Sequence, residues 1–424
     1  MTFFRERGIC MRMRLYAIVA VIYCFSNGLL WAAGGAGVRI EKTFTKADGL
    51  ASDNVLAILE DRTGDIWIGT TEGVSRYDGE GFQTYTTQEG LAENATGLLF
   101  EDSLGRIWFA SGVLGNVFAR EKGVDMSLMA MPLSELAKLP GDQKPEGTQN
   151  PIPKKGVSRY DGEGLRTFTT THGLADNTIL DIFQDDTGLL WLATDAGVSR
   201  YDGGTFKTLK TQGPIGMAVL PEYWNQVTAI APDTAGNFWF ASTAGITYYN
   251  HQRSLWRYFD VNLSPFQEMG LSETGHVTDL VFDALGNLWM SRETVSIESS
   301  GIRRYDGESC IAFPQSHALP MNSVYHIMED RNGNLWFSGV KKHFPTLQET
   351  QNTLGMTYTD TGVGVSVYNG KTFENFDTDE GLPSNRVRSV FQDRNGNLWF
   401  ATDAGVAVGV YDSSEVRKER RRNR

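Results

Sequence analysis

Hydrophobic residues recur along most of this chain in short runs of four to six residues, separated by turns rich in Asp, Gly and Asn. The segments 55–60, 66–70, 74–77 and 82–86 are typical of these runs. Short runs rich in β-branched and aromatic residues, bounded by turn residues, are typical of β-strands. The pattern therefore predicts a long series of short strands joined by tight turns.

One turn motif occurs seven times, with an Asp three residues before a Gly and six residues before a Trp. The seven copies span 61–67, 102–108, 185–191, 233–239, 283–289, 330–336 and 393–399. The Asp carboxylate can accept backbone N–H groups in such a turn, and the Gly can take a positive φ. We expect structural roles for Asp61, Gly64 and Trp67, and for the matching tryptophans. Those are Trp108, Trp191, Trp239, Trp289, Trp336 and Trp399.

Each repeat contains four predicted strands, and one such small sheet cannot bury both of its faces alone. Seven of them stacked radially would cover one another. The sequence therefore predicts an all-β fold, a seven-bladed β-propeller of four-stranded antiparallel blades over residues 38–412. The last repeat supplies only three strands, and 38–45 has the form of a fourth. We expect this N-terminal strand to complete the last blade and close the ring.

The two ends of the chain differ from the repeats. Four arginines precede an apolar run at 15–33, which is typical of an export signal, although the run is almost long enough to remain as an anchor helix. We assign 1–34 to a signal peptide or signal anchor. We expect an exported protein, periplasmic or extracellular, with membrane anchoring by 15–33 as the alternative to cleavage. The basic tail 413–424 is expected to be disordered.

Composition excludes several functional classes. The net charge of -12 argues against a nucleic-acid partner. After removal of a leader only Cys310 would remain, so neither an intramolecular disulfide nor a cysteine metal site is expected. The sequence lacks the Gly-x-Ser-x-Gly and His-Glu-x-x-His motifs, and its six histidines are scattered. We therefore expect no metal, no other cofactor and no catalytic residues, and we expect a monomer.

The repeat resembles that of the two-component regulator propeller family. Gly-Leu pairs begin at 49, 90, 173 and 381, and Gly-Val-Ser-Arg-Tyr-Asp-Gly occurs at 73–79, 156–162 and 197–203. The resemblance implies an extracytoplasmic sensor that binds a small molecule and signals to a histidine kinase or another membrane partner. In that family, propellers often occur in tandem ahead of a membrane helix and a kinase. This sequence shows one propeller and neither of those segments, so we expect a stand-alone or truncated member.

The irregular parts of the repeats fall at one end of the predicted strands. They are the insertions 113–155 and 340–361 and the connections 210–226 and 260–276. Long loops on a rigid scaffold commonly carry binding sites, so we expect the ligand on this face, with carbohydrate as a candidate. Tyr223, Trp224 and Asn225 offer two aromatics and an amide for a sugar or aromatic ligand. The equal alternative is that they plug the loop onto the ring.

Candidate ligand residues also occur on the strands. Arg292 stands where most repeats have Thr or Ser and could bind an anion, and His276 precedes the first strand of repeat five. One position of the innermost strands holds Ala57, Leu98, Asp181, Ala229, Asp279, His326 and Ser389. Its polar members, with Arg388 beside Ser389, are candidates for binding at the channel. The alternative is that these groups bond to neighbouring backbone or water.

Three functions remain open at this point. The leading hypothesis is a non-enzymatic exported sensor or binding propeller. The second is a protein-interaction scaffold that uses 113–155 and 340–361 as its contact surface. The third is a lyase, since propellers with similar short repeats include enzymes that open cyclic antibiotics with His, acid groups and a divalent metal. His326 with Asp279, or His276 with Glu268 or Glu273, would then supply the base and the metal ligands.

Overall fold

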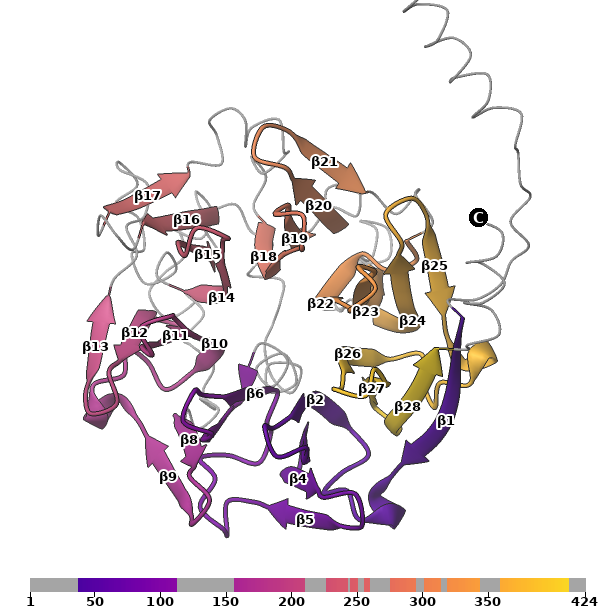
Figure 1. Cartoon of the computed structure of the whole chain (residues 1–424), viewed down its shortest axis with the longest axis horizontal. Helices are drawn as coiled ribbons and strands as arrows, with labels where there is room; N and C mark the ends of the chain where they lie inside the picture. The colour runs from indigo at the N-terminus through magenta and orange to yellow at the C-terminus, as the bar shows by residue number, and fades with distance from the viewer. Residues whose placement is uncertain are drawn as a thin grey trace, which may run out of the picture. The chain divides into compact units, whose positions relative to one another are not determined.

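The chain divides into two units, Met1–Gly35 and Ala36–Arg424, and the computed structural model describes parts of the second. The described residues are 37–112, 156–209, 226–242, 245–250, 255–259, 275–294, 301–313, 319–343 and 359–411. They form seven four-stranded antiparallel sheets arranged in a ring (Figure 1). The predicted seven-bladed β-propeller is thus confirmed. The expected leader and tail lie outside the described residues.

Each blade runs outward from an innermost strand in the order of the chain. Blade 1 contains β2 (Val55–Glu60), β3 (Ile66–Thr70), β4 (Val74–Tyr77) and β5 (Phe82–Tyr85). Blade 2 contains β6 (Leu98–Glu101), β7 (Ile107–Ala110), β8 (Val157–Tyr160) and β9 (Leu165–Phe168). Blade 3 contains β10 (Ile179–Gln184), β11 (Leu190–Thr194), β12 (Gly197–Tyr201) and β13 (Phe206–Leu209). Blade 4 contains β14 (Val227–Pro232), β15 (Phe238–Ser242), β16 (Gly245–Asn250) and β17 (Leu255–Phe259).

The remaining blades follow the same plan. Blade 5 contains β18 (Gly275–Phe282), β19 (Leu288–Thr294), β20 (Gly301–Tyr305) and β21 (Cys310–Phe313). Blade 6 contains β22 (Ser323–Glu329), β23 (Leu335–His343), β24 (Thr359–Tyr368) and β25 (Phe373–Phe376). Blade 7 contains β26 (Val387–Gln392), β27 (Leu398–Thr402), β28 (Gly405–Tyr411) and β1 (Val38–Phe44). Short 3-10 helices at Lys46–Asp48, Thr170–His172 and Thr378–Glu380 lie in connections between blades.

The ring is joined where the first described strand meets the last. β1 pairs antiparallel with β28, from Val38 opposite Tyr411 to Phe44 opposite Val406. The sheet order is β1-β28-β27-β26, so β1 is the outer strand of blade 7 (Figure 1). Two distant parts of the sequence therefore share one blade.

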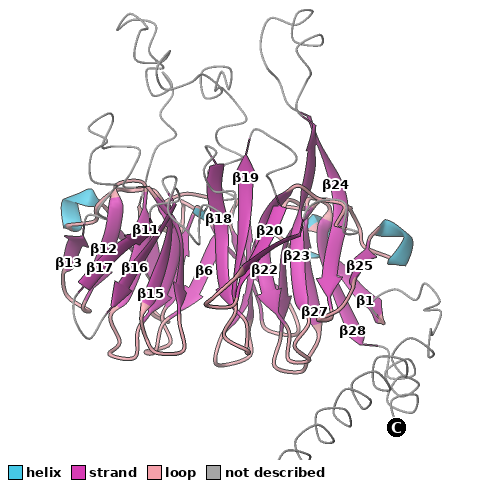
Figure 2. Cartoon of the chain, turned by 90° about the horizontal axis from the view of Figure 1, so that it is seen from above, coloured by secondary structure: helices cyan, strands magenta, loops and turns pink. Residues whose placement is uncertain are grey.

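The two ends of the strands differ in their connections. The Asp turns are tight hairpins gathered on one face of the ring, and the described 3-10 helices lie towards the opposite face (Figure 2). On that opposite face β23 and β24 run past their sheet as a two-stranded ribbon, with His343 opposite Thr359. The segment 340–361, which the sequence pattern assigns to an inserted loop, therefore begins and ends as strand, and 344–358 lies outside the described residues.

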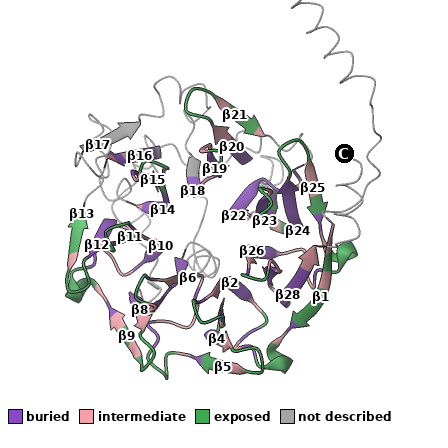
Figure 3. Cartoon of the chain, in the orientation of Figure 1, coloured by how far each residue is buried: buried purple, intermediate pink, exposed green. Residues whose placement is uncertain are grey.

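The core lies between neighbouring blades rather than within any one sheet. The inner strands are largely buried and the outer strands largely exposed (Figure 3). Trp67, Trp108, Trp191 and Trp336 are each at most 1% exposed, and each packs against the following blade. Burying such large side chains contributes much of the stability of a short-stranded sheet. Among the described residues, no helix has both the length and the apolar character needed to cross a membrane.

Candidate functional site

The repeated Asp turn is a closed hydrogen-bond unit. Asp61 accepts the backbone N–H groups of Thr63 at 2.8 Å and Asp65 at 3.1 Å through Oδ1, and the Trp67 indole N–H at 2.8 Å through Oδ2. Gly64 completes the turn with a φ of 98°. Burial favours a higher pKa for Asp61, but the bonds from Thr63, Trp67 and Asp65 together hold the pKa below its ordinary value. These contacts occupy the carboxylate, which holds the turn and the indole in place.

The same bond recurs in every blade. The indole N–H donates to the Asp Oδ2 at 2.8 Å in blades 2, 3, 5 and 6 and at 2.9 Å in blade 7. In blade 4 the distance from Trp239 to Asp233 is 3.4 Å. Asn237 donates to both oxygens of Asp233 there, at 3.1 and 3.0 Å. The turns thus form a regular scaffold with one weaker copy.

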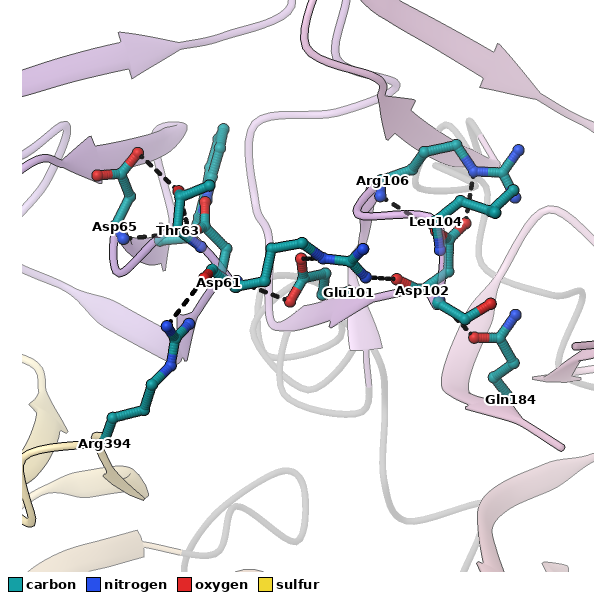
Figure 4. Close-up of polar contacts among 12 residues, drawn as sticks. Asp61, Thr63, Asp65, Glu101, Asp102, Leu104, Arg106, Gln184 and Arg394 are labelled. Carbon is teal, nitrogen blue, oxygen red and sulfur yellow. Dashed lines mark hydrogen bonds and ion pairs between the residues drawn. The ribbon is translucent and has the colours of Figure 1, made fainter. Parts of the chain in front are cut away.

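Polar side chains on the turn face also link neighbouring blades (Figure 4). Glu101 of blade 2 accepts the backbone N–H of Arg62 at 3.0 Å and its Nε at 2.6 Å. Arg62 Nη2 reaches the Asp102 carbonyl at 2.6 Å. Arg394 of blade 7 donates in the same way to the carbonyl of Arg62 at 2.9 Å. This face is therefore occupied by contacts between blades.

The candidate ligand residues of the innermost strands include Asp181 on β10. Its Oδ1 accepts the N–H of Ile182 at 2.8 Å, and its Oδ2 accepts the N–H of Ile230 at 2.7 Å. Ile230 belongs to β14, so the carboxylate bridges blades 3 and 4. Burial raises the pKa of Asp181 to about 7. The Ile230 bond opposes this shift, the Asp279 charge adds to it, and the Ile182 bond opposes it.

Asp279 on β18 makes the corresponding bridge between blades 5 and 6. Its Oδ1 accepts the N–H of Leu280 at 2.8 Å, and its Oδ2 accepts that of Ile327 at 2.8 Å. Burial raises the pKa of Asp279 to about 6, against these two hydrogen bonds. Asp181 and Asp279 each keep part of their surface exposed. Both carboxyl groups can therefore gain or lose a proton near neutral pH while they join neighbouring blades.

His326 and Ser389 occupy the same position on β22 and β26. Burial lowers the pKa of His326 to about 4, so the imidazole is neutral at pH 7. Its Nδ1 is buried and makes no hydrogen bond within the described part of the chain. Ser389 donates its hydroxyl to the Leu56 carbonyl of blade 1 at 3.3 Å. The bonding to neighbouring backbone weighed from the sequence thus occurs at Asp181, Asp279 and Ser389.

The remaining candidate residues are two buried arginines, a histidine described by its backbone alone, and residues outside the described part of the chain. The Arg388 side chain is 2% exposed, and its guanidinium lies 5.7 Å from the centre of the Tyr325 ring. Arg292 is 1% exposed near the end of β19, opposite Val277. The backbone of His276 lies within β18, opposite Glu293, rather than before the strand, and its side chain is not described. Tyr223, Trp224 and Asn225 lie outside the described residues, as do Glu268 and Glu273.

The described residues were also compared with the ligand sets that metal ions need. No group of three or more His, Cys, Asp or Glu side chains that could hold an ion is present among the described residues. Asp279 does lie against the peptide joining His326 to Ile327, because its Oδ2 accepts the Ile327 N–H. Its Oδ1 accepts the N–H of Leu280, so each oxygen of Asp279 already accepts one backbone N–H.

Sequence reasoning missed an ion-pair cluster where blades 6 and 7 meet, on the face opposite the Asp turns. Arg386 Nη1 lies 2.7 Å from Asp360 and its Nε 3.3 Å from Asp403. Beside it, Asn322 accepts the N–H of Lys342 at 2.7 Å and donates to its carbonyl at 2.9 Å, which anchors the ribbon. The sequence did show that this repeat is longer than the others. Asp360, however, lies within the segment 340–361, which was interpreted as a loop, so its pairing with Arg386 was not expected.

The ring and its repeated turn define this protein as a seven-bladed β-propeller built from one sequence repeat. The model of the family described as two component regulator propeller matches residues 49–72, 173–196, 318–341 and 381–404. These four matches confirm the resemblance to the two-component regulator propeller repeat that the sequence predicts.

Solved structures share the fold. The extracellular domain of a putative hybrid two component system from B. thetaiotaomicron superposes with a TM-score of 0.58 at 19% identity, over 89% of this chain and 41% of that one. Virginiamycin B lyase from Staphylococcus aureus gives 0.54 at 13% identity, over 88% and 98%. These identities show the fold alone.

One curated relative matches a short stretch. It is Histidine kinase P4 of Formosa agariphila, which is 42% identical over 43 residues. That stretch is 10% of this chain and 3% of the kinase. The chain thus spans less than half of the extracellular domain it resembles and a small fraction of the kinase.

Proposed function

We propose that this protein is a non-enzymatic sensor propeller that works outside the cytoplasm and relays ligand binding to a two-component signalling partner. The observation that carries this proposal is the set of four family matches distributed around a complete ring. The resemblance to the extracellular domain of a hybrid two-component system supports the same direction. The proposed ligand is a small molecule, with carbohydrate as the first class to test.

The ligand is proposed to bind at the loop-rich end of the channel. The turn face is filled by short, regular hairpins whose carboxylates are engaged by the scaffold. Along the channel the equivalent side chains differ from blade to blade, and they include the ionisable groups of Asp181, Asp279 and His326. Sites that vary on a repeated scaffold are where recognition commonly lies.

Hydrogen exchange with a panel of neutral and uronic-acid oligosaccharides tests this proposal. We expect one oligosaccharide class to slow amide exchange at the loop-rich ends of β10, β18, β22 and β26, and to leave the Asp turns unchanged. His326→Ala should weaken that binding at least about tenfold, which corresponds to about 1.4 kcal/mol. Gln83→Ala, on the exposed outer strand β5, is the matched control.

Three outcomes would count against the proposal. Protection confined to the Asp turns would place the site on the wrong face. Chemical conversion of an oligosaccharide or of a cyclic antibiotic by the purified protein would make it an enzyme. Capture of a protein partner without any effect of small molecules would favour the scaffold hypothesis instead.

A further inference from the structure

The blades are not joined equally on the turn face. At five junctions, the Glu or Gln that ends an innermost strand accepts a backbone N–H from the Asp turn of the preceding blade. The five acceptors are Glu101 at 3.0 Å, Gln184 at 2.6 Å, Glu329 at 2.7 Å, Gln392 at 2.9 Å and Glu60 at 2.7 Å. Each such bond contributes a modest amount to stability, and repeated around a ring they resist separation of the blades.

Two junctions lack this acceptor because of the residue type alone. Pro232 ends β14 and Phe282 ends β18, and neither side chain can accept a hydrogen bond. The missing links are therefore those between blades 3 and 4 and between blades 4 and 5. Blade 4 is held on neither side by the turn-face bond that the other junctions share.

At one of these two junctions, a side chain of an innermost strand makes a different hydrogen bond between the blades. Between blades 3 and 4, Asp181 accepts the N–H of Ile230 at 2.7 Å. Between blades 4 and 5 the corresponding residue is Ala229, whose side chain cannot make such a bond. The polar link described there is from the Thr228 hydroxyl to the Val277 carbonyl at 2.6 Å.

Among the described residues, the core between blades 4 and 5 also differs from the other cores in its side chains. It contains the small side chains of Ala229, Ala231 and Ala241. The other six cores between blades each include a tryptophan that is at most 6% exposed. Trp239, the equivalent residue of blade 4, is only partly buried, and its bond to Asp233 is the longest of the seven. A partly exposed tryptophan removes less apolar surface from water than a buried one.

From these features we infer that the junction of blades 4 and 5 is a built-in seam, where the ring opens before it opens anywhere else. Blade 5 also carries Asp279 and Arg292, two candidate ligand residues, on β18 and β19. A ligand bound there would shift the equilibrium between the open and the closed seam. That shift would alter how the partner binds. This last step rests on the proposed function, whereas the opening of the seam does not.

Hydrogen exchange of the full-length protein without ligand tests the seam. Local opening exposes amides according to its free energy. We expect amides of β14 and β18 to exchange at least about fivefold faster than those of β2 and β26, since one hydrogen bond of ordinary strength corresponds to about that factor. Equal rates in the two pairs of strands, or slower exchange in β14 and β18, would overturn the inference.

Matched variants at one position show whether the missing acceptor is the cause. Phe282→Gln supplies an amide oxygen to the Thr234 N–H, as Gln392 does for Arg331, whereas Phe282→Leu removes the ring without supplying an acceptor. We expect exchange in β14 and β18 to be about fivefold slower in the Gln variant than in the Leu variant. Gln392→Phe should speed exchange in β22 and β26. If the Gln and Leu variants are alike, the acceptor is not what holds the junctions, and this part of the inference fails.

The coupling to ligand is measured separately. If an oligosaccharide binds, Phe282→Gln should change its affinity, because the variant shifts the balance between open and closed seam. Binding with unchanged affinity would refute the coupling and leave the seam itself standing. Absence of binding by every oligosaccharide, with fast exchange at β14 and β18, would count against the proposed ligand class and not against the seam.

Discussion

Asp61 in a turn and Asp181 on an innermost strand both accept backbone N–H groups, yet their pKa values shift in opposite directions. Asp61 in a turn accepts three N–H groups and the Thr63 hydroxyl, and its pKa lies below the ordinary value. Asp181 in the channel accepts two backbone N–H groups, and its pKa is raised to about 7. In these two groups the outcome follows from the balance between hydrogen-bond donors, which lower the pKa, and burial, which raises it.

The largest effect should come from removing a turn carboxylate. Asp185→Ala leaves the N–H groups of Thr187 and Leu189 and the indole of Trp191 without their acceptor. We expect the free energy of unfolding to fall by about 2–4 kcal/mol. Asp233→Ala should cost about half as much, because Trp239 is partly exposed and its bond is long. Urea unfolding midpoints measure both, and equal losses would contradict the view that blade 4 has a weaker turn.

Replacing the Asp181 carboxylate should instead change how the free energy of unfolding depends on pH. The folded pKa of Asp181 is about 7, above its value of about 3.9 in an unfolded chain. Between pH 4 and 7 the folded state keeps a proton that the unfolded state releases, so the free energy of unfolding falls as pH rises. Asp181→Asn mimics the protonated group. Relative to wild type, it should gain about 1–3 kcal/mol between pH 4 and 7 in denaturation series. A constant difference across that range would contradict the raised pKa.

The turn carboxylate should give the opposite pH dependence. Because the folded pKa of Asp61 is lowered, its charged form stabilises the fold above pH about 4, and that contribution is lost as pH falls through the folded pKa. Asp61→Asn should therefore cost about 1 kcal/mol near neutral pH and progressively less in acid. The same denaturation series measures it, and a cost that grows in acid would reverse the sign we assign.

The smallest effect should come from the ion pair on the turn face. In Glu101→Gln the amide oxygen can still accept the Arg62 N–H, as Gln184 does for Ser103. What is lost is the charge pairing with the Arg62 guanidinium, whose side chain is 49% exposed. We expect a loss of about 0.5 kcal/mol at low salt that disappears at high salt. A loss much larger than this would show that the charge, and not the backbone bond, holds the junction.

The sequence predicted the blades well because their determinants are local. The spacing of Asp61, Gly64 and Trp67 is set within one hairpin, and seven copies left little choice of fold. The partners of Asp181 and Asp279 were not predictable in this way, because Ile230 and Ile327 lie in the next blade and the fit between blades is a tertiary property. The extension of β23 to His343 was missed for a related reason. The hydrogen bonds of Asn322 and the ion pair of Arg386 hold the extended ends of β23 and β24, whose sequence alone has no regular strand pattern.

The pairing of β1 with β28 has a consequence for how the protein is made. Among the propeller strands, Val38–Phe44 is synthesised first and Gly405–Tyr411 last, so β1 is made long before its ladder partner. During that time its backbone groups are available to other chains, which is a hazard for aggregation. Contacts so far apart in sequence also form slowly. The strand pair that closes the ring is therefore expected to form late in folding, after the blades between β1 and β28.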